Sequence, residues 1–190
     1  MKVNGKKYTS IWVEEGNRVF IIDQRWLPHQ FKLIELITLN DFLVSIRDMW
    51  IRGAPLIGVT AAFGFAKSMQ YDNSDKSLHE TKSLLLSTRP TAVNLHWAVK
   101  IMFDLLINVD RDSRQDIALI KAKEILTRDI LSNKEIGKNG YEIIKNIIDK
   151  KNTDKINILT HCNAGWLATV DWGTATSPIY YSKEKGVNIH

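Results

Sequence analysis

The sequence of 190 residues has few of the features that mark secreted or membrane proteins, and it contains a single cysteine, Cys162. One cysteine excludes an internal disulfide framework and is typical of the reducing cytoplasm. No run approaches the roughly 18 apolar residues that a membrane-spanning helix needs, and the amino terminus lacks the apolar core of a signal peptide. No repeat or low-complexity segment is evident. We therefore expect a soluble, cytoplasmic protein with no membrane partner.

A large excess of charge of either sign is also missing. The chain has 26 Lys and Arg against 21 Asp and Glu, which gives a net charge of +5. The basic residues are scattered along helical patterns and are not interleaved with aromatic residues, so we expect a solvated face and no nucleic-acid partner. With 44% hydrophobic and 25% charged residues, the composition is that of an ordinary globular domain. An anionic small molecule is compatible with this charge but is not demanded by it.

Residues 1–150 are predicted to form a small β-meander followed by a helical body. The meander would consist of strands at 6–13, 18–23 and 32–37, with a Gly- and Asn-containing turn at 14–17. Apolar residues at helical spacing then predict helices at 38–50, 56–70, 77–87, 91–108 and 114–150.

Particular residues refine these helices. Thr38, followed by Asp41, is a capping signal. The segment 56–70 carries almost no charge, so it should be buried on nearly all sides. Pro90 suits the first turn of the helix at 91–108. That helix is expected to bury a stripe of apolar side chains at helical spacing, namely Val93, Trp97, Ile101 and Leu105. Gly137 and Gly140 indicate a bend or a change of helix within 114–150.

The pattern changes after a polar run at 150–155. A strand is predicted at 156–161, a helix at about 171–185 and the start of another strand at 187–190, which together open a βαβ unit. Pro178 falls inside the predicted helix, where it is costly unless it lies in the first turn. The predicted fold class is α/β. Residues 1–150 would form an N-terminal β-meander and helical domain, and residues 151–190 the incomplete start of a Rossmann-like parallel α/β domain.

Cys162 lies at the end of the strand predicted at 156–161, where open α/β sheets carry their functional side chains. A lone cysteine can equally be a small buried hydrophobic residue, because a reactive thiol needs a charged or dipolar neighbourhood. His161 does not decide between the two, since neighbours along a strand point to opposite faces. The residues alone leave both readings open.

Two loops that precede predicted helices each contain an arginine, Arg52 before Gly53-Ala54-Pro55 and Arg89 before Pro90. Helix N-termini present free N–H groups and a favourable dipole to a phosphate. An arginine can bind phosphate oxygens with two parallel hydrogen bonds, and a glycine lets a ligand approach the backbone. Each loop is a weak signal by itself, because many loop arginines are structural; together with the cysteine they predict a phosphate site.

These three loops, in this order and spacing, resemble those of the methylthioribose-1-phosphate isomerases. That family also contains the regulatory subunits of translation initiation factor 2B. Its most specific motifs here are Arg-Asp-Met-Trp-Ile-Arg-Gly-Ala-Pro and Leu-Thr-His-Cys-Asn-Ala-Gly. The segments that carry the resemblance are 22–25, 46–59, 89–95, 158–165 and 173–175.

The resemblance implies an aldose–ketose isomerisation without cofactor or metal, from 5-methylthioribose 1-phosphate to 5-methylthioribulose 1-phosphate in methionine salvage. It implies that Cys162 is catalytic and that Arg52, Gly53, Ala54 and Arg89 hold the sugar phosphate. The anomeric oxygen of this sugar carries the phosphate, so ring opening needs acid assistance at the ring oxygen. A second group must then assist the transfer of hydrogen from C2 to C1.

The family also places an aspartate opposite the cysteine, in a Thr-Asp-Asn-Met-like segment that these 190 residues do not contain. We therefore expect a chain truncated to about the N-terminal half of the family, without its second catalytic residue. The alternatives are a non-catalytic remnant or interaction module, and a regulatory subunit like those of initiation factor 2B. A homodimer and pairing with a separately encoded C-terminal half are both open.

Overall fold

The computed structural model describes residues 1–153 and 155–190. Residue 154, which belongs to the polar run at 150–155, lies outside the described residues. The strands are β1 (Lys2–Val3), β2 (Lys6–Lys7), β3 (Ile11–Glu14), β4 (Arg18–Ile22), β5 (Leu33–Leu36), β6 (Lys155–Ile156) and β7 (Asn188–Ile189). The α-helices are α1 (Leu39–Arg47), α2 (Ala54–Tyr71), α3 (Asp75–Thr88), α4 (Val93–Leu106), α5 (Arg114–Lys151) and α6 (Ser177–Glu184). Short 3-10 turns include η2 (Gln24–Trp26), η3 (Arg111–Ser113) and η4 (Trp166–Ala168).

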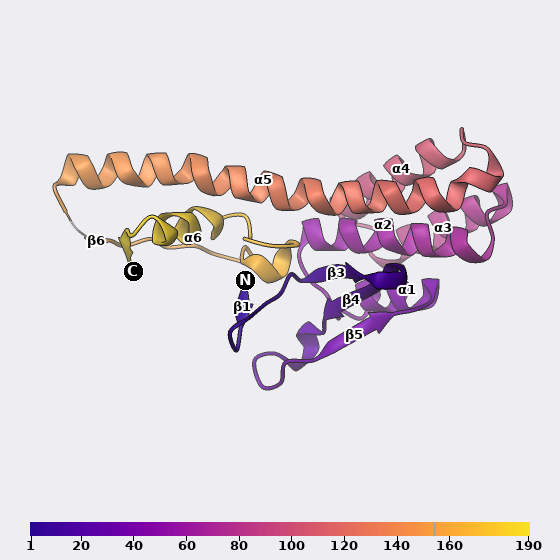
Figure 1. Cartoon of the computed structure of the whole chain (residues 1–190), viewed down its shortest axis with the longest axis horizontal. Coiled ribbons are helices and arrows are strands. Elements are labelled where there is room, and N and C mark those ends of the chain that lie inside the picture. Colours follow the sequence, from indigo (N-terminus) through magenta and orange to yellow (C-terminus); the bar gives the residue numbers. More distant parts are fainter. Residues whose placement is uncertain (154) are drawn as a thin grey trace.

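The long helix α5 spans the molecule, and α2, α4 and α6 pack along it (Figure 1). Helices α2 and α4 contact one part of it, and α6 contacts the other. The chain is therefore mixed α/β and mostly helical, as the sequence predicts. None of the described helices is long and apolar enough to cross a membrane.

The predicted meander is confirmed as the antiparallel sheet β3-β4-β5. Its first strand is shorter than predicted, because residues 6–7 pair with β1 in a separate hairpin. Ser10 lies between the two. Its backbone N–H donates to the Val170 carbonyl at 2.8 Å, and its carbonyl accepts from Ile22 N–H at 3.1 Å. The chain thus contacts the C-terminal segment before it enters the sheet.

Helix α2 is buried on nearly all sides, as its lack of charge predicts. Its glycines allow neighbouring elements to come close. A β-carbon on Gly58 would lie 2.9 Å from the Asn94 carbonyl oxygen, and one on Gly64 would lie 2.9 Å from Phe42 Cβ. The predicted cap of α1 is also confirmed, since Thr38 and Asp41 form a reciprocal capping box.

The face that α4 buries differs from the prediction. The helix begins at Val93, and Pro90 lies outside it. Val93 is 77% exposed and Trp97 is 42% exposed. The buried side chains form a second apolar stripe at helical spacing, namely Leu95, Val99, Met102 and Leu106. The sequence of α4 carries both stripes, and packing against α2 and α3 selects the second.

The bend predicted within 114–150 is wrong, because α5 is one helix of 38 residues. Its two glycines instead allow the start of α6 to lie against it. A β-carbon on Gly137 would lie 2.7 Å from Ser177 Oγ, and one on Gly140 would lie 2.4 Å from Pro178 Cγ. Pro178 lies in the first turn of α6, where proline is tolerated.

The predicted β-α-β order at the C-terminal end is confirmed, with β6 and β7 parallel. The strand predicted at 156–161 is wrong beyond Ile156, and the helix predicted at about 171–185 begins only at Ser177. Leu159 is 97% exposed. The only described partner of β6 is β7, which pairs with two of its residues, and parallel strands form extended ladders only within larger covered sheets.

The contact between α5 and α6 predicts that a Gly140→Ala substitution destabilises the protein. In an isolated helix this change should stabilise by about 1 kcal/mol. Here the new methyl group would meet the rigid Pro178 ring, and such overpacking costs about 1–3 kcal/mol. Urea unfolding measures the difference. Asn139→Ala, at an exposed neighbouring position, is the control and should be neutral or slightly stabilising. A Gly140→Ala variant as stable as the parent protein would contradict this packing.

Candidate functional site

The loop that starts α2 and the η4 turn are in direct backbone contact. Gly53 has φ of +96°, and a β-carbon there would lie 2.4 Å from both Ala168 Cα and the Ala168 carbonyl oxygen. Only glycine combines a readily adopted positive φ with the absence of a β-carbon. The sequence predicts that Gly53 lets a ligand approach the backbone. In the structure, Ala168 occupies the space beside the Gly53 Cα instead. A phosphate contact through the Gly53 N–H stays a prediction.

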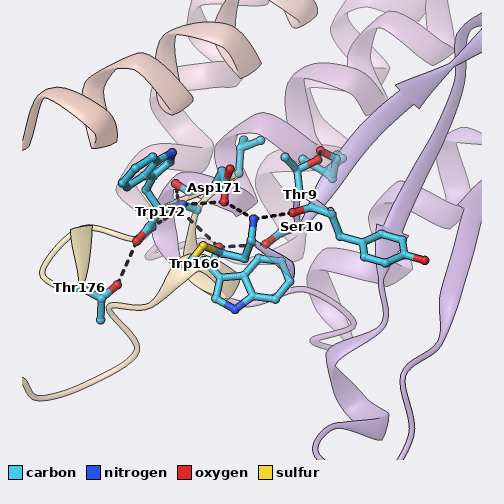
Figure 2. A network of polar contacts seen from close by, with 12 residues as sticks. Thr9, Ser10, Trp166, Asp171, Trp172 and Thr176 are labelled. Carbon is cyan, nitrogen blue, oxygen red and sulfur yellow. Dashed lines mark hydrogen bonds and ion pairs between the residues drawn. The ribbon is translucent and has the colours of Figure 1, made fainter. Parts of the chain in front are cut away.

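Two side chains from the N-terminal sheet region hold the same η4 turn. Ser10 Oγ donates to the Trp166 carbonyl at 2.9 Å, a contact drawn in Figure 2. Gln24 Nε2 donates to the Leu167 carbonyl at 2.7 Å. Since Gly53 packs on the next residue, Ala168, each of the three residues of η4 is contacted by an element from the first 53 residues.

The segment after η4 is held by a polar network around Asp171 (Figure 2). The Met1 ammonium group lies 2.9 Å from Asp171 Oδ1 and also donates to the Tyr8 carbonyl. The backbone N–H of Trp172 donates to the same carboxylate oxygen at 2.9 Å. Asp171 is buried, so these contacts fix the start of the segment that leads to α6.

The Cys162 loop folds back on residues 173–176. The Thr174 N–H donates to the Ala164 carbonyl at 3.0 Å, and Thr176 Oγ1 donates to it at 3.2 Å. Gly173 has φ of +77°, and a β-carbon there would lie 2.6 Å from the Ala164 carbonyl oxygen. The structure thus brings together two of the segments that carry the family resemblance.

Cys162 itself is exposed, so the reading as a small buried hydrophobic residue is wrong. It has φ of +71°, a conformation that is uncommon outside glycine. Its carbonyl accepts from the Ala164 N–H at 3.1 Å, which closes a tight turn. His161 and Asn163 are also exposed. The loop therefore presents its polar side chains to solvent, while the segments on its C-terminal side are fixed.

The two arginines occupy different kinds of position. Arg52 is exposed and directly precedes Gly53, the N-cap of α2. Arg89 is half-buried, follows the last residue of α3, and its carbonyl accepts from the Ala92 N–H at 3.0 Å. In the part of the chain that the structure describes, no hydrogen bond or ion pair joins Cys162, Arg52 and Arg89. Their convergence on one ligand stays a prediction, as does the role of Ala54.

A cleft of about 260 Å³ is lined by the first turns of α2 and α4 and by the loop before α6. Pro55, Asn94 and Thr174 line it, one from each of three segments that resemble the family. Asp129 and Asn133, which lie one turn apart on α5, also line it. Within residues 1–153 and 155–190, no group of three or more His, Cys, Asp or Glu side chains lies close enough to hold a metal.

Asp129 is a residue that the sequence reasoning missed. Burial raises the pKa of its carboxyl group, while the Val170 N–H and Asn133 partly offset that rise. The Val170 N–H donates to Asp129 Oδ2 at 2.7 Å, so this side chain links α5 to the segment after η4. A signal was available: Asp129 and Asn133 follow the buried Ile125 at intervals of four, where an apolar residue is expected.

Comparison with known proteins finds a matching family profile and similar proteins that share one name. The sequence profile described as "Initiation factor 2 subunit family" matches residues 50–190. Proteins named methylthioribose-1-phosphate isomerase are similar over the whole chain, with 53% identity in Cereibacter sphaeroides and 48% in Escherichia coli. The chain covers 52% of each of these proteins, and thus spans about half the length of the curated relatives it matches.

Two solved structures are similar to the chain. The 5-methylthioribose 1-phosphate isomerase of Pyrococcus horikoshii has a TM-score of 0.83 and 31% identity, over 96% of this chain and 51% of that one. The delta subunit of translation initiation factor eIF-2B from A. fulgidus has a TM-score of 0.81 and 29% identity, over 97% of this chain and 53% of that one.

The raised pKa of Asp129 predicts a pH-dependent effect of an Asp129→Asn substitution. The asparagine keeps an oxygen for the Val170 N–H but removes the ionisable group. An acid whose folded pKa is raised lowers stability as pH rises from its unfolded pKa of about 3.9 through its folded value. Urea unfolding at pH 7 should therefore show the variant to be more stable than the parent protein, and the difference should shrink toward pH 3. An equal difference at both pH values would contradict the assignment.

Proposed function

The chain belongs to the initiation factor 2 subunit family, and from that premise we propose that it acts in the isomerisation of 5-methylthioribose 1-phosphate to 5-methylthioribulose 1-phosphate. The proposal rests most directly on the contact between Gly53 and Ala168. Through it, the loop with Arg52 and the turn that follows Cys162 lie against each other. Relatives that bear the isomerase name match every part of the chain, including both of these loops.

The phosphate group would bind at the start of α2. The first N–H groups of a helix have no partner within it and carry a partial positive charge. Here the N-cap is Gly53, which makes no side-chain cap, and Pro55 lacks an N–H group. The N–H groups of Gly53 and Ala54 are therefore the ones nearest to Arg52 in the chain. Arg52, and Arg89 at the end of α3, would neutralise the phosphate through charge-assisted hydrogen bonds.

Cys162 would act next to the sugar carbons. In the reaction the ring oxygen gains a proton, C2 loses its hydrogen to C1, and the C2 hydroxyl loses its proton as the ketone forms. The Cys162 side chain beside C1 and C2 would act as a general base or shield the transfer from water. Its exposure in the described chain leaves room for a substrate. The aspartate that the family resemblance pairs with it would supply acid assistance to ring opening.

A regulatory role like that of an initiation factor subunit is the second candidate. It is favoured by the similarity to the A. fulgidus eIF-2B delta subunit, at 29% identity. The isomerase reading is stronger, since identity to proteins of that name reaches 53%. We expect the activity in the reducing cytoplasm, which suits a lone exposed cysteine. A homodimer, or pairing with a separately encoded C-terminal half, stays a prediction.

Substitutions at Arg52 and Cys162 test the two halves of the proposed site. Binding of 5-methylthioribose 1-phosphate should weaken about 10- to 100-fold in Arg52→Ala, because a hydrogen bond between charged groups is lost. Binding should change little in Cys162→Ser. Titration calorimetry measures both. Arg111→Ala, which removes an equal charge from η3, is the matched control and should bind like the parent protein.

Two results would count against the proposal. Equal affinities of the Arg52→Ala and Arg111→Ala variants would remove Arg52 from the phosphate site. Turnover by the 190-residue chain alone, at the rate of a full-length relative and unaffected by Cys162→Ser, would contradict the roles given to the cysteine and to the aspartate.

A further inference from the structure

Gln24 contacts both the segment that leads to Arg52 and the η4 turn that follows the Cys162 loop. Its backbone N–H donates to the Trp50 carbonyl at 2.8 Å, two residues before Arg52. Its side-chain Nε2 donates to the Leu167 carbonyl at 2.7 Å. Gln24 is buried, so water cannot readily replace either bond. One residue thus connects the segment that enters α2 with the η4 turn that follows the Cys162 loop.

The neighbours of Gln24 hold it in this position. Asp23 is fully buried and caps the η2 turn by accepting from the Arg25 N–H at 3.1 Å. Arg25 also forms an ion pair with Asp23, with Nη2 2.6 Å from Oδ2. The Arg25 guanidinium lies over the Trp50 ring, 4.2 Å from its centroid, and such a contact is attractive. Asp23 and Arg25 therefore fix the backbone of Gln24. Arg25 also packs on Trp50, whose carbonyl accepts from the Gln24 N–H.

The Gln24 hydrogen bond and the Gly53 contact hold adjacent residues of the η4 turn. The bond from Gln24 sets the position of Leu167, and the next residue, Ala168, lies against Gly53 with no space for a β-carbon. A shift of either loop would break the hydrogen bond or open the contact. Ser10 also holds η4, through Trp166, but it does not bond to residues 50–53 in the described chain. Gln24 bonds to both segments, through its backbone N–H to Trp50 and through its side chain to Leu167.

We propose that Gln24 is a positioning residue that keeps the Cys162 loop and the Arg52 loop in one relative arrangement. As a statement about a sugar-phosphate site, this rests on the proposed function. As a statement about the two loops, it rests only on the contacts above. It assigns a role to the Asp23-Gln24-Arg25 segment, which neither the phosphate contacts nor the thiol chemistry explains.

Gln24→Met tests the proposal, because the methionine side chain has nearly the same length but no N–H group, so the bond to Leu167 is lost while the backbone bond to Trp50 is kept. Hydrogen–deuterium exchange of residues 165–169 should speed up about tenfold or more, since one buried hydrogen bond is lost from η4. Exchange in α2 and α4 should stay within about threefold of the parent protein. Gln30→Met makes the same change at an exposed position six residues on, and it should leave exchange at 165–169 unchanged. Unchanged exchange in Gln24→Met would overturn the proposal.

A second measurement separates positioning from a general loss of stability. Cys162 is the only cysteine of the sequence, so its alkylation by iodoacetamide reports on the loop directly. Saturating 5-methylthioribose 1-phosphate should slow alkylation about tenfold in the parent protein. In Gln24→Met this protection should fall to about threefold or less, while the affinity for the sugar phosphate stays within about threefold. Equal protection in both proteins would show that Gln24 does not position the thiol.

The two experiments also distinguish the two proposals. A parent protein that does not bind the sugar phosphate would refute the proposed function, and exchange at 165–169 would still decide whether Gln24 joins the loops. Gln24→Asn serves as a second variant if Gln24→Met does not fold. It keeps the amide but is shorter by one C–C bond of about 1.5 Å, and it should give the same faster exchange.

Discussion

The backbone contact between Gly53 and Ala168 is the constraint on which the rest of the structure depends. It joins the loop that begins the most buried helix, α2, to a turn more than a hundred residues later in the chain. Because a β-carbon cannot fit there, the contact forms only with glycine at position 53. Gln24 then satisfies the Leu167 carbonyl of η4, and Ser10 adds a hydrogen bond to the Trp166 carbonyl, which also accepts from the Thr169 N–H. The proposed phosphate loop therefore lies against the η4 turn that follows the Cys162 loop.

Glycines also permit a close contact at α5. Gly137 and Gly140 remove the side chains that would keep α6 away, and the first turn of α6 lies in the space they leave. Asp129, also on α5, binds the Val170 N–H between η4 and α6. The segment that follows Cys162 is consequently held from the N-terminal sheet on one side and from α5 on the other. Cys162 itself remains exposed, so the segment that is held on both sides follows a loop whose thiol faces solvent.

Local patterns predicted much of this fold, and contacts between distant residues decided the rest. The meander, the capping box of α1 and the burial of α2 follow from turns, caps and missing charge within a few residues. The continuity of α5 does not, because glycine lowers helix propensity locally while its benefit comes from Pro178, far along the chain. The buried face of α4 was mistaken because its sequence holds two apolar stripes. Of the candidate site, the exposure of Cys162 could not be inferred, and the roles of Gln24 and Asp129 needed the partners that only the folded chain supplies.

A nuclear Overhauser effect between Ala168 and Gly53 tests the central contact most directly. In protein labelled at the alanine methyl groups, the account predicts a strong cross-peak between the Ala168 methyl and the Gly53 α-protons, because Ala168 Cβ lies 2.5 Å from the position of a β-carbon on Gly53. The cross-peak should be present without any ligand. Its absence, together with a solvent-exposed Ala168 methyl group, would mean that the two loops are not in contact and would contradict the account.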